Sequence, residues 1–205
     1  MIVIIDYGMG NLHSIQYKLK KLGVETIVTA DSDIISQADK IVLPGVGHFA
    51  KGMQNLHTLG LIDILNYKVI KENTPVLGIC LGMQLLTDFS EEGNAKGLGW
   101  IKGKTVRFNF NHYPEQLKVP HIGWNTLNLK KTNPLINKID EENLFYFVHS
   151  YYVQCENAKD IVATTTYGIE FHSVIHSNNI FGTQFHPEKS HDCGMVMLKN
   201  FIMLD

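Results

Sequence analysis

Pro75-Val76-Leu77-Gly78-Ile79-Cys80-Leu81-Gly82-Met83-Gln84-Leu85-Leu86 is the stretch that decides the fold of this chain. In it, an apolar run leads into a cysteine between two glycines, and a helix-like run follows. In an α/β sheet, a strand, a Gly-x-nucleophile-x-Gly turn and a helix place the nucleophile on a sharp elbow, because only glycine leaves room for that backbone. The pattern predicts that Cys80 is a nucleophile at a helix N-terminus, where the helix dipole favours the thiolate. The alternative is a small buried hydrophobe, the usual role of a free cysteine.

Short β-branched runs alternate with longer amphipathic stretches before Cys80. They predict strands at 2–5, 25–28, 40–43 and 76–79, and helices at about 11–22 and across 49–71. This alternation is typical of βαβ units, in which helices cover both faces of a parallel sheet. We therefore expect an α/β fold.

The sequence changes character after residue 100, where short strand-like runs are separated by Gly, Pro and Asn turns. They predict strands at 105–108, 144–148, 161–165, 171–175 and 180–184, followed by a closing helix at 193–204. The second half is expected to be mostly antiparallel and continuous with the same core. Since no linker or repeat interrupts the chain, we expect one domain over residues 1–205, built on an open mixed sheet with an antiparallel extension.

The composition limits the possible partners. The 205 residues are 44% hydrophobic, and 18 Lys and Arg against 20 Asp and Glu give a net charge of -2 with no basic run for nucleic acid. No apolar stretch approaches the roughly 20 residues of a membrane span, and the N-terminus lacks the basic region of a signal peptide. The three cysteines show neither disulfide nor metal-site spacing. We expect a cytoplasmic protein without a metal or other cofactor, acting on a small molecule or a protein partner.

His186 is the best candidate for the base that a nucleophilic cysteine needs. It follows a predicted strand and precedes Pro187, which stiffens the turn, and Glu188 stands two positions further on. Residues two apart in an extended or turned segment face the same side, so Glu188 is expected to bind one ring nitrogen while the other faces Cys80. The alternative is a surface turn.

A glycine-rich turn, Pro44-Gly45-Val46-Gly47-His48-Phe49, follows the predicted strand at 40–43. It should lie at the same carboxyl edge of the sheet as Cys80. Backbone N–H groups of this turn, together with the amide of Leu81, are what a tetrahedral oxyanion needs. An ordinary βα turn is the alternative, but the ligand-binding edge of an open α/β sheet favours a functional role.

Two motifs carry a resemblance to a known family. Gly78-Ile79-Cys80-Leu81-Gly82-Met83-Gln84 with Gln184-Phe185-His186-Pro187-Glu188-Lys189-Ser190 resembles the class I (triad) glutamine amidotransferases, which have a flavodoxin-like fold. Within them, four further segments resemble the glutaminase subunits of imidazole glycerol phosphate synthase: Asp6-Tyr7-Gly8-Met9-Gly10-Asn11-Leu12, the turn at 44–49, Val119-Pro120-His121-Ile122-Gly123-Trp124-Asn125 and Phe147-Val148-His149-Ser150-Tyr151-Tyr152. The resemblance runs from Met1 to the final helix.

The resemblance implies a reaction on L-glutamine. Cys80 would attack the side-chain carboxamide to give a glutamyl thioester and ammonia, while His186 transfers protons and Glu188 orients the imidazole. The residues implied to bind glutamine or its oxyanion are Val46, Gly47, Leu81, Gln84, His149, Ser150 and Tyr151. Two alternatives stay open, namely that Gln84 faces solvent and that His149 is a hydrogen-bonded core histidine.

The resemblance also implies a partner, because ammonia released into water becomes ammonium, which is no nucleophile. In the family, a (β/α)8-barrel cyclase forms a heterodimer with the glutaminase. It uses the channelled ammonia to make imidazole glycerol phosphate and aminoimidazole carboxamide ribotide in histidine biosynthesis. The motif positions implied to lie at the interface are Asn11, Trp124 and Lys189. The alternative for Trp124 is a place in the core.

Two segments depart from the family pattern. Phe171-His172-Ser173 replaces the more usual Phe-x-Ala, and Ser190-His191-Asp192-Cys193 follows the catalytic strand. We expect neither to contact the triad and both to influence docking. They leave open a paralogous glutaminase that supplies ammonia to a different synthase, such as a sugar amidotransferase of surface polysaccharide biosynthesis.

Two other classes of function fit the sequence less well. The first is another cysteine hydrolase, such as a peptidase or a γ-glutamyl hydrolase; the turn at 44–49, the Trp124 motif and the run at 149–151 argue against it. The second is a non-catalytic module that activates a partner. The intact set of Cys80, His186 and Glu188 argues against that class.

Overall fold

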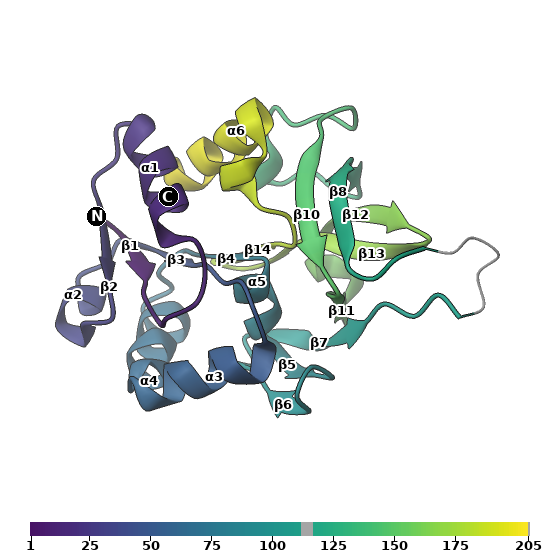
Figure 1. Cartoon of the computed structure of the whole chain (residues 1–205). Helices are drawn as coiled ribbons and strands as arrows, with labels where there is room; N and C mark the ends of the chain where they lie inside the picture. The colour runs from purple at the N-terminus through teal and green to yellow at the C-terminus, as the bar shows by residue number, and fades with distance from the viewer. Residues whose placement is uncertain (112–116, 205) are drawn as a thin grey trace.

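A long mixed sheet runs through the computed structural model, which describes residues 1–111 and 117–204 (Figure 1). Its strand order is β2-β1-β3-β4-β14-β13-β11-β7-β5-β6. Neighbours from β2 to β14 pair in parallel, whereas β14, β13, β11 and β7 pair antiparallel. The predicted open sheet with a parallel core and an antiparallel extension is confirmed.

The helices and strands have the following bounds. The strands are β1 (Ile2–Ile5), β2 (Thr26–Thr29), β3 (Lys40–Leu43), β4 (Val76–Ile79), β5 (Thr87–Ser90), β6 (Ala95–Lys96), β7 (Ile101–Arg107), β8 (His121–Asn125), β9 (Asn128–Leu129), β10 (Phe145–His149), β11 (Tyr151–Cys155), β12 (Ile161–Tyr167), β13 (Ile169–Ser177) and β14 (Ile180–Thr183). The helices are α1 (Leu12–Lys21), α2 (Ser32–Ser36), α3 (Phe49–Thr58), α4 (Leu61–Asn66), α5 (Leu81–Leu85) and α6 (His191–Ile202), with shorter turns η1 (Tyr67–Lys71), η2 (Pro134–Ile136), η3 (Ala158–Asp160) and η4 (Pro187–Lys189).

Helices cover both faces of the parallel part of the sheet. Figure 1 shows α1 and α6 on one side and α3, α4 and α5 on the other. Because side chains alternate along a strand, Ile4 packs in one core cluster with Ile15 of α1, while Val3 packs in the other with Leu56 of α3. Two apolar layers thus hold the sheet in place, as the alternating pattern of the sequence predicts.

The predicted strands at 2–5, 40–43 and 76–79 match β1, β3 and β4. The helical stretch at 49–71 is interrupted at Gly60, which takes a left-handed φ of 67° between α3 and α4, and α4 continues directly into η1. Helix α2 and the strands β5, β6, β8, β9 and β11 are not among the predicted elements. The shortest of these, β6 and β9, have two residues each and carry no periodic pattern.

Distant parts of the chain meet at the carboxyl end of β4. Strand β14 pairs in parallel with β4, with Thr183 opposite Ile79. The backbone N–H of Cys80 donates to the Thr183 carbonyl at 2.7 Å. The residues after β14 therefore lie beside the predicted nucleophile.

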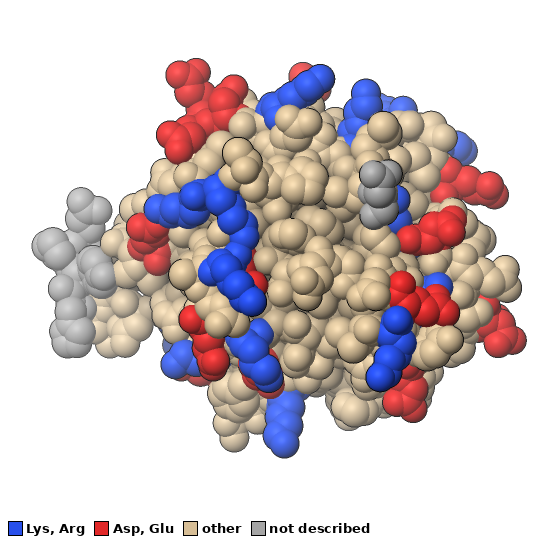
Figure 2. Space-filling model, turned by 180° about the vertical axis from the view of Figure 1, so that it is seen from behind, with Lys and Arg blue, Asp and Glu red and all other residues tan. Residues whose placement is uncertain are grey.

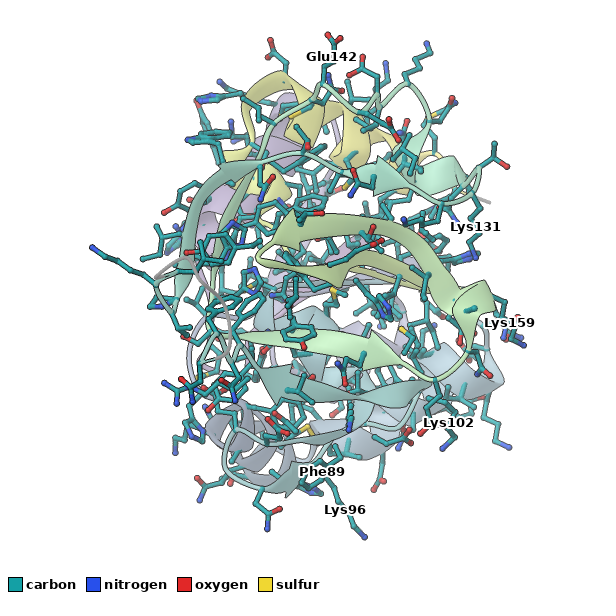
Figure 3. All side chains as sticks on the ribbon, turned by 90° about the vertical axis from the view of Figure 1, so that its right-hand side faces the viewer. Phe89, Lys96, Lys102, Lys131, Glu142 and Lys159 are labelled. Atoms are coloured by element: carbon teal, nitrogen blue, oxygen red, sulfur yellow. The ribbon has the colours of Figure 1, made fainter. Side chains whose placement is uncertain are left out.

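Charged side chains of both signs share the face shown in Figure 2, where they surround a broad neutral area. In the view onto the antiparallel end, the labelled side chains of Lys102, Lys131 and Lys159 lie at the periphery (Figure 3). Within residues 1–111 and 117–204, no helix has the length and apolar character needed to cross a membrane.

Candidate active site

Cys80 sits on a tight elbow between β4 and α5. It is the N-cap of α5 with φ 53° and ψ -108°, a conformation that costs energy for any residue other than glycine. A Cβ on Gly82 would lie 1.8 Å from the Leu43 carbonyl oxygen, and one on Gly78 would lie 2.8 Å from the Gly82 carbonyl. Both flanking glycines are therefore sterically required, as the elbow pattern predicts.

His186 and Glu188 form a buried pair next to the elbow. Nδ1 of His186 lies 2.8 Å from Oε1 of Glu188, and both side chains are almost fully buried. A surface turn is thus the wrong interpretation of the His-Pro-Glu segment. Burial by itself lowers the pKa of His186, but the negative charges of Cys80 and Glu188 outweigh it and raise this pKa to about 10.

The second ring nitrogen of His186 is buried and has no hydrogen-bond partner among the described residues. Because Nδ1 is held by Glu188, Nε2 is the nitrogen free to exchange a proton with the Cys80 sulfur or a substrate. A buried imidazole that is held by a carboxylate and keeps one ring nitrogen free beside a cysteine is the arrangement that a general base needs to activate a nucleophile.

Ser190 connects the turn that carries His186 to strand β10. Its hydroxyl donates to the His186 carbonyl at 2.6 Å and accepts from the Tyr146 backbone N–H at 3.0 Å. The expectation that the segment at 190–193 does not contact the triad is therefore wrong for Ser190. A small hydroxyl side chain so close in sequence can reach the backbone of its own turn.

Gln84 points inward and is buried, so the solvent-facing alternative is wrong. Its Nε2 donates to the Tyr151 carbonyl at 2.9 Å and to Oε1 of Gln184 at 3.2 Å. Nε2 of Gln184 lies 3.7 Å from Sγ of Cys80. Gln184 belongs to one of the two family motifs, but it is not among the site residues predicted from the sequence.

His149 is a hydrogen-bonded core histidine. Its Nδ1 lies 2.8 Å from the Tyr151 carbonyl, and its Nε2 lies 3.1 Å from Nδ1 of His121. Because a carbonyl only accepts, His149 carries its proton on Nδ1 and accepts from His121 through Nε2. Burial lowers the pKa of His149 to about 3 and that of His121 to about 4, so both rings are neutral.

The segment that contains His149 nevertheless borders the nucleophile. The Val148 carbonyl lies 3.9 Å from Sγ of Cys80. Both ring nitrogens of His149 are bonded to protein groups, so this ring has no free nitrogen for a ligand.

The glycine-rich turn lies beside the elbow. The Gly45 carbonyl accepts from the Leu81 N–H at 3.3 Å, and the Tyr7 hydroxyl donates to the Pro44 carbonyl at 2.5 Å. Val46 and Gly47 are exposed, and Gly47 has a φ of 124° that favours glycine. The turn is therefore anchored on its proline side and open to solvent at its tip.

Trp124 lies on the surface of β8, not in the core, with 44% of its area exposed. Its ring stacks on His191 with centroids 4.9 Å apart, and Nζ of Lys189 lies 5.6 Å from the centre of the Tyr146 ring. Trp124 also meets Tyr146 edge to face. We call Trp124, Tyr146, Lys189 and His191 the tryptophan patch.

Asn11 is placed at the start of α1, where its side chain accepts from the Ser14 N–H at 3.3 Å. Helix α1 packs against the turn η4, which carries Lys189. Asn11, Lys189 and Trp124, the three residues implied at an interface, thus lie on neighbouring elements.

The described residues form a surface cavity whose lining does not include Cys80, His186 or Glu188. In the part of the chain that the structure describes, no group of His, Cys, Asp and Glu side chains is arranged to hold a metal ion. The cavity of about 730 Å³ is lined by residues between 129 and 139 and by the end of α6, remote in the fold from Cys80.

Comparison with known proteins places the chain in a family. The family model described as glutamine amidotransferase class-I matches residues 3–204. The chain is 55% identical over 202 residues to imidazole glycerol phosphate synthase subunit HisH 2 of Methanococcus maripaludis, covering 98% of each chain. It is 48% identical to the subunit HisH of Sulfurimonas denitrificans, covering 98% of this chain and 97% of that one.

Solved structures share the fold at low sequence identity. PurLQS from Thermotoga maritima superimposes with a TM-score of 0.72 at 14% identity, over 98% of this chain and 96% of that one. The glutaminase domain of Trypanosoma brucei CTPS with bound acivicin gives a TM-score of 0.64 at 15% identity, over 100% of this chain and 94% of that one.

Proposed function

The chain belongs to the class I glutamine amidotransferases, and from that premise we propose that it is the glutaminase subunit of an imidazole glycerol phosphate synthase. The relatives that carry this name match it along nearly their whole length. The observation that carries the chemistry is the buried His186–Glu188 pair beside a cysteine on a strained elbow. A structural cysteine needs neither the strain nor the charged pair.

The proposed reaction has two halves. The Cys80 thiolate attacks the side-chain carbonyl carbon of glutamine, and the C–N bond breaks as the His186 imidazolium gives its proton to the departing ammonia. Water then attacks the glutamyl thioester while His186 takes up the proton. The C–S bond breaks, which releases glutamate and restores the thiolate. Glu188 holds the imidazole in the tautomer that both halves need.

Glutamine would lie between the Cys80 elbow, the glycine-rich turn at 44–49 and the segment at 148–151. The N–H groups of Leu81 and of the turn at Val46 and Gly47 would stabilise the tetrahedral oxyanion after the Gly45–Val46 peptide has rotated, because the Leu81 N–H is bonded to the Gly45 carbonyl in this structure. The remaining groups proposed to bind glutamine are Gln84, Ser150, Tyr151 and the backbone at His149.

The ammonia would pass to a (β/α)8-barrel cyclase bound at the tryptophan patch and Asn11. An exposed tryptophan with a neighbouring cation is typical of an interface anchor. The complex would form imidazole glycerol phosphate and aminoimidazole carboxamide ribotide, in the cytoplasm. Docking keeps the ammonia away from water, which would protonate it.

Cys80→Ala tests this proposal in the complex with the cyclase. We expect glutamine-dependent synthesis to be lost and synthesis from added ammonium salt to be retained, because only glutamine cleavage needs the thiolate. Cys155→Ala, at a half-buried cysteine on β11, is the matched control and should keep both activities. Glutamine hydrolysis by Cys80→Ala would disprove the nucleophile. Failure of the cyclase to bind would instead favour a subunit that serves another synthase.

A further inference from the structure

The side-chain amide of Gln184 contacts the sulfur of Cys80. Its Nε2 lies 3.7 Å from Sγ, within the range for an N–H donor and a sulfur acceptor. Gln184 is fully buried, and its backbone N–H is fixed by the Ser173 carbonyl at 2.9 Å. A polar side chain is thus held against the reacting atom.

The hydrogen-bond partners decide which end of this amide faces the sulfur. The Tyr151 carbonyl only accepts, so the Gln84 atom 2.9 Å away must be its NH₂ group. The same NH₂ group lies 3.2 Å from the Gln184 amide, which must offer its oxygen there. The NH₂ group of Gln184 is therefore the end that faces Cys80.

We propose that Gln184 is a further catalytic residue, whose amide N–H donates to Sγ of Cys80 and stabilises the thiolate, and that Gln84 holds the amide in this orientation. The proposal deepens the proposed function, since it rests on Cys80 acting as the nucleophile. Hydrogen bonds to an ionised acceptor are about twice as strong as neutral ones, and burial strengthens them further. His186 supplies a proton that leaves during the reaction, whereas the amide donor stays in place through both halves.

Gln184→Glu separates this role from simple packing. Glutamate has the same shape and still offers an oxygen to Gln84, but it replaces the donor at the sulfur with a second negative charge. A carboxylate at this fully buried position also carries a desolvation cost, so the uncharged Gln184→Met is measured beside it. Gln154→Glu, on β11 and bonded to the Tyr152 hydroxyl, is the matched control for the same substitution.

The measurement is the rate at which iodoacetamide alkylates Cys80 at pH values between 6 and 9. Mass spectrometry of the Cys80 peptide gives this rate, and the peptides of Cys155 and Cys193 serve as internal references. Because only the thiolate reacts, we expect the rate at pH 7 to fall about tenfold or more in Gln184→Glu. In Gln154→Glu we expect it to stay within about twofold of the parent. An unchanged rate in Gln184→Glu would overturn the proposal.

A second variant covers the case in which Gln184→Glu does not fold, which circular dichroism would reveal. Gln184→Met keeps the size but has no N–H, so Cys80 should again react several-fold more slowly, and an unchanged rate in this variant would overturn the proposal. If Cys80 in the parent chain does not react faster than Cys155, the nucleophile itself fails and the proposed function with it. The two proposals therefore fail in different ways.

Discussion

The backbone N–H of Leu81 donates a hydrogen bond to the Gly45 carbonyl at 3.3 Å. This carbonyl and the N–H of Val46 belong to one trans peptide unit, so they point in opposite directions. The Val46 N–H therefore points away from the elbow, and the Leu81 N–H is already engaged. In this orientation neither donor is free for the oxyanion that glutamine cleavage creates.

The first prediction is that the isolated chain is a poor glutaminase. Rotation of the Gly45–Val46 peptide would release Leu81 and turn the Val46 N–H toward the oxyanion. We expect the cyclase loaded with its acceptor nucleotide to favour that rotation and raise the glutaminase rate roughly 100-fold, the usual effect of an oxyanion donor. Steady-state rates of the chain alone, with cyclase, and with cyclase and acceptor measure this. A free chain that already runs at the full rate would contradict it.

The second prediction concerns the triad. His186→Ala should abolish glutaminase activity nearly as completely as loss of Cys80, whereas Glu188→Gln should be less damaging, because orienting an imidazole contributes less than transferring its proton. The rates of both single variants and the double variant in the complex decide, since effects within a triad are not additive. His57→Ala, at an exposed position on α3, is the control. If Glu188→Gln were the more damaging variant, the assigned roles would be wrong.

The elbow at Cys80 and the His186–Glu188 pair were predictable because their signals are local. Glycines on either side of Cys80 and a carboxylate two positions after His186 are visible in short stretches of sequence. Their meeting depends on β14 lying beside β4, a pairing between segments about a hundred residues apart that no local pattern indicates. The resemblance supplied that link.

The hydrogen bonds of His149 could not be predicted from the sequence. Whether it binds ligand or lies hydrogen-bonded in the core depends on His121, which stands directly opposite on β8. The register of two short strands decides this, and neither strand reveals it alone. The contact between Gln184 and Cys80 could not be predicted for the same reason, since it forms only when β14 pairs with β4.

The third prediction follows from the neutral pair His121 and His149. Their pKa values in the fold lie near 4 and 3, below the ordinary 6.5 of the unfolded chain. As the pH falls below 6.5, these histidines bind protons in the unfolded chain but not in the folded one. The free energy of unfolding therefore decreases until the pH reaches the pKa values of the folded state. Each histidine contributes a slope of about 1.4 kcal/mol per pH unit in this window.

His121→Phe tests this slope, because it removes one such histidine and keeps an aromatic ring beside Tyr167 and Phe147. Urea unfolding between pH 4.5 and 6.5 should show a pH dependence smaller by about one proton than that of the parent. The exposed His57→Phe provides the comparison. A parent slope that persists in His121→Phe would show that this pair does not control acid stability.

The last prediction is that Tyr7 tethers the glycine turn. Its hydroxyl is buried, and burial followed by the nearby charge of Cys80 raises its pKa, so it stays protonated and donates to the buried Pro44 carbonyl. Tyr7→Phe leaves that carbonyl without this donor and should lower the free energy of unfolding by about 1–3 kcal/mol in urea titrations. Tyr17→Phe, where the ring is 56% exposed, should change it by less than about 0.5 kcal/mol. Equal free energies of unfolding for the two variants would mean that the Tyr7 hydrogen bond does not hold Pro44 in place. The whole turn at 44–49 could then move, and rotation would not be limited to the Gly45–Val46 peptide.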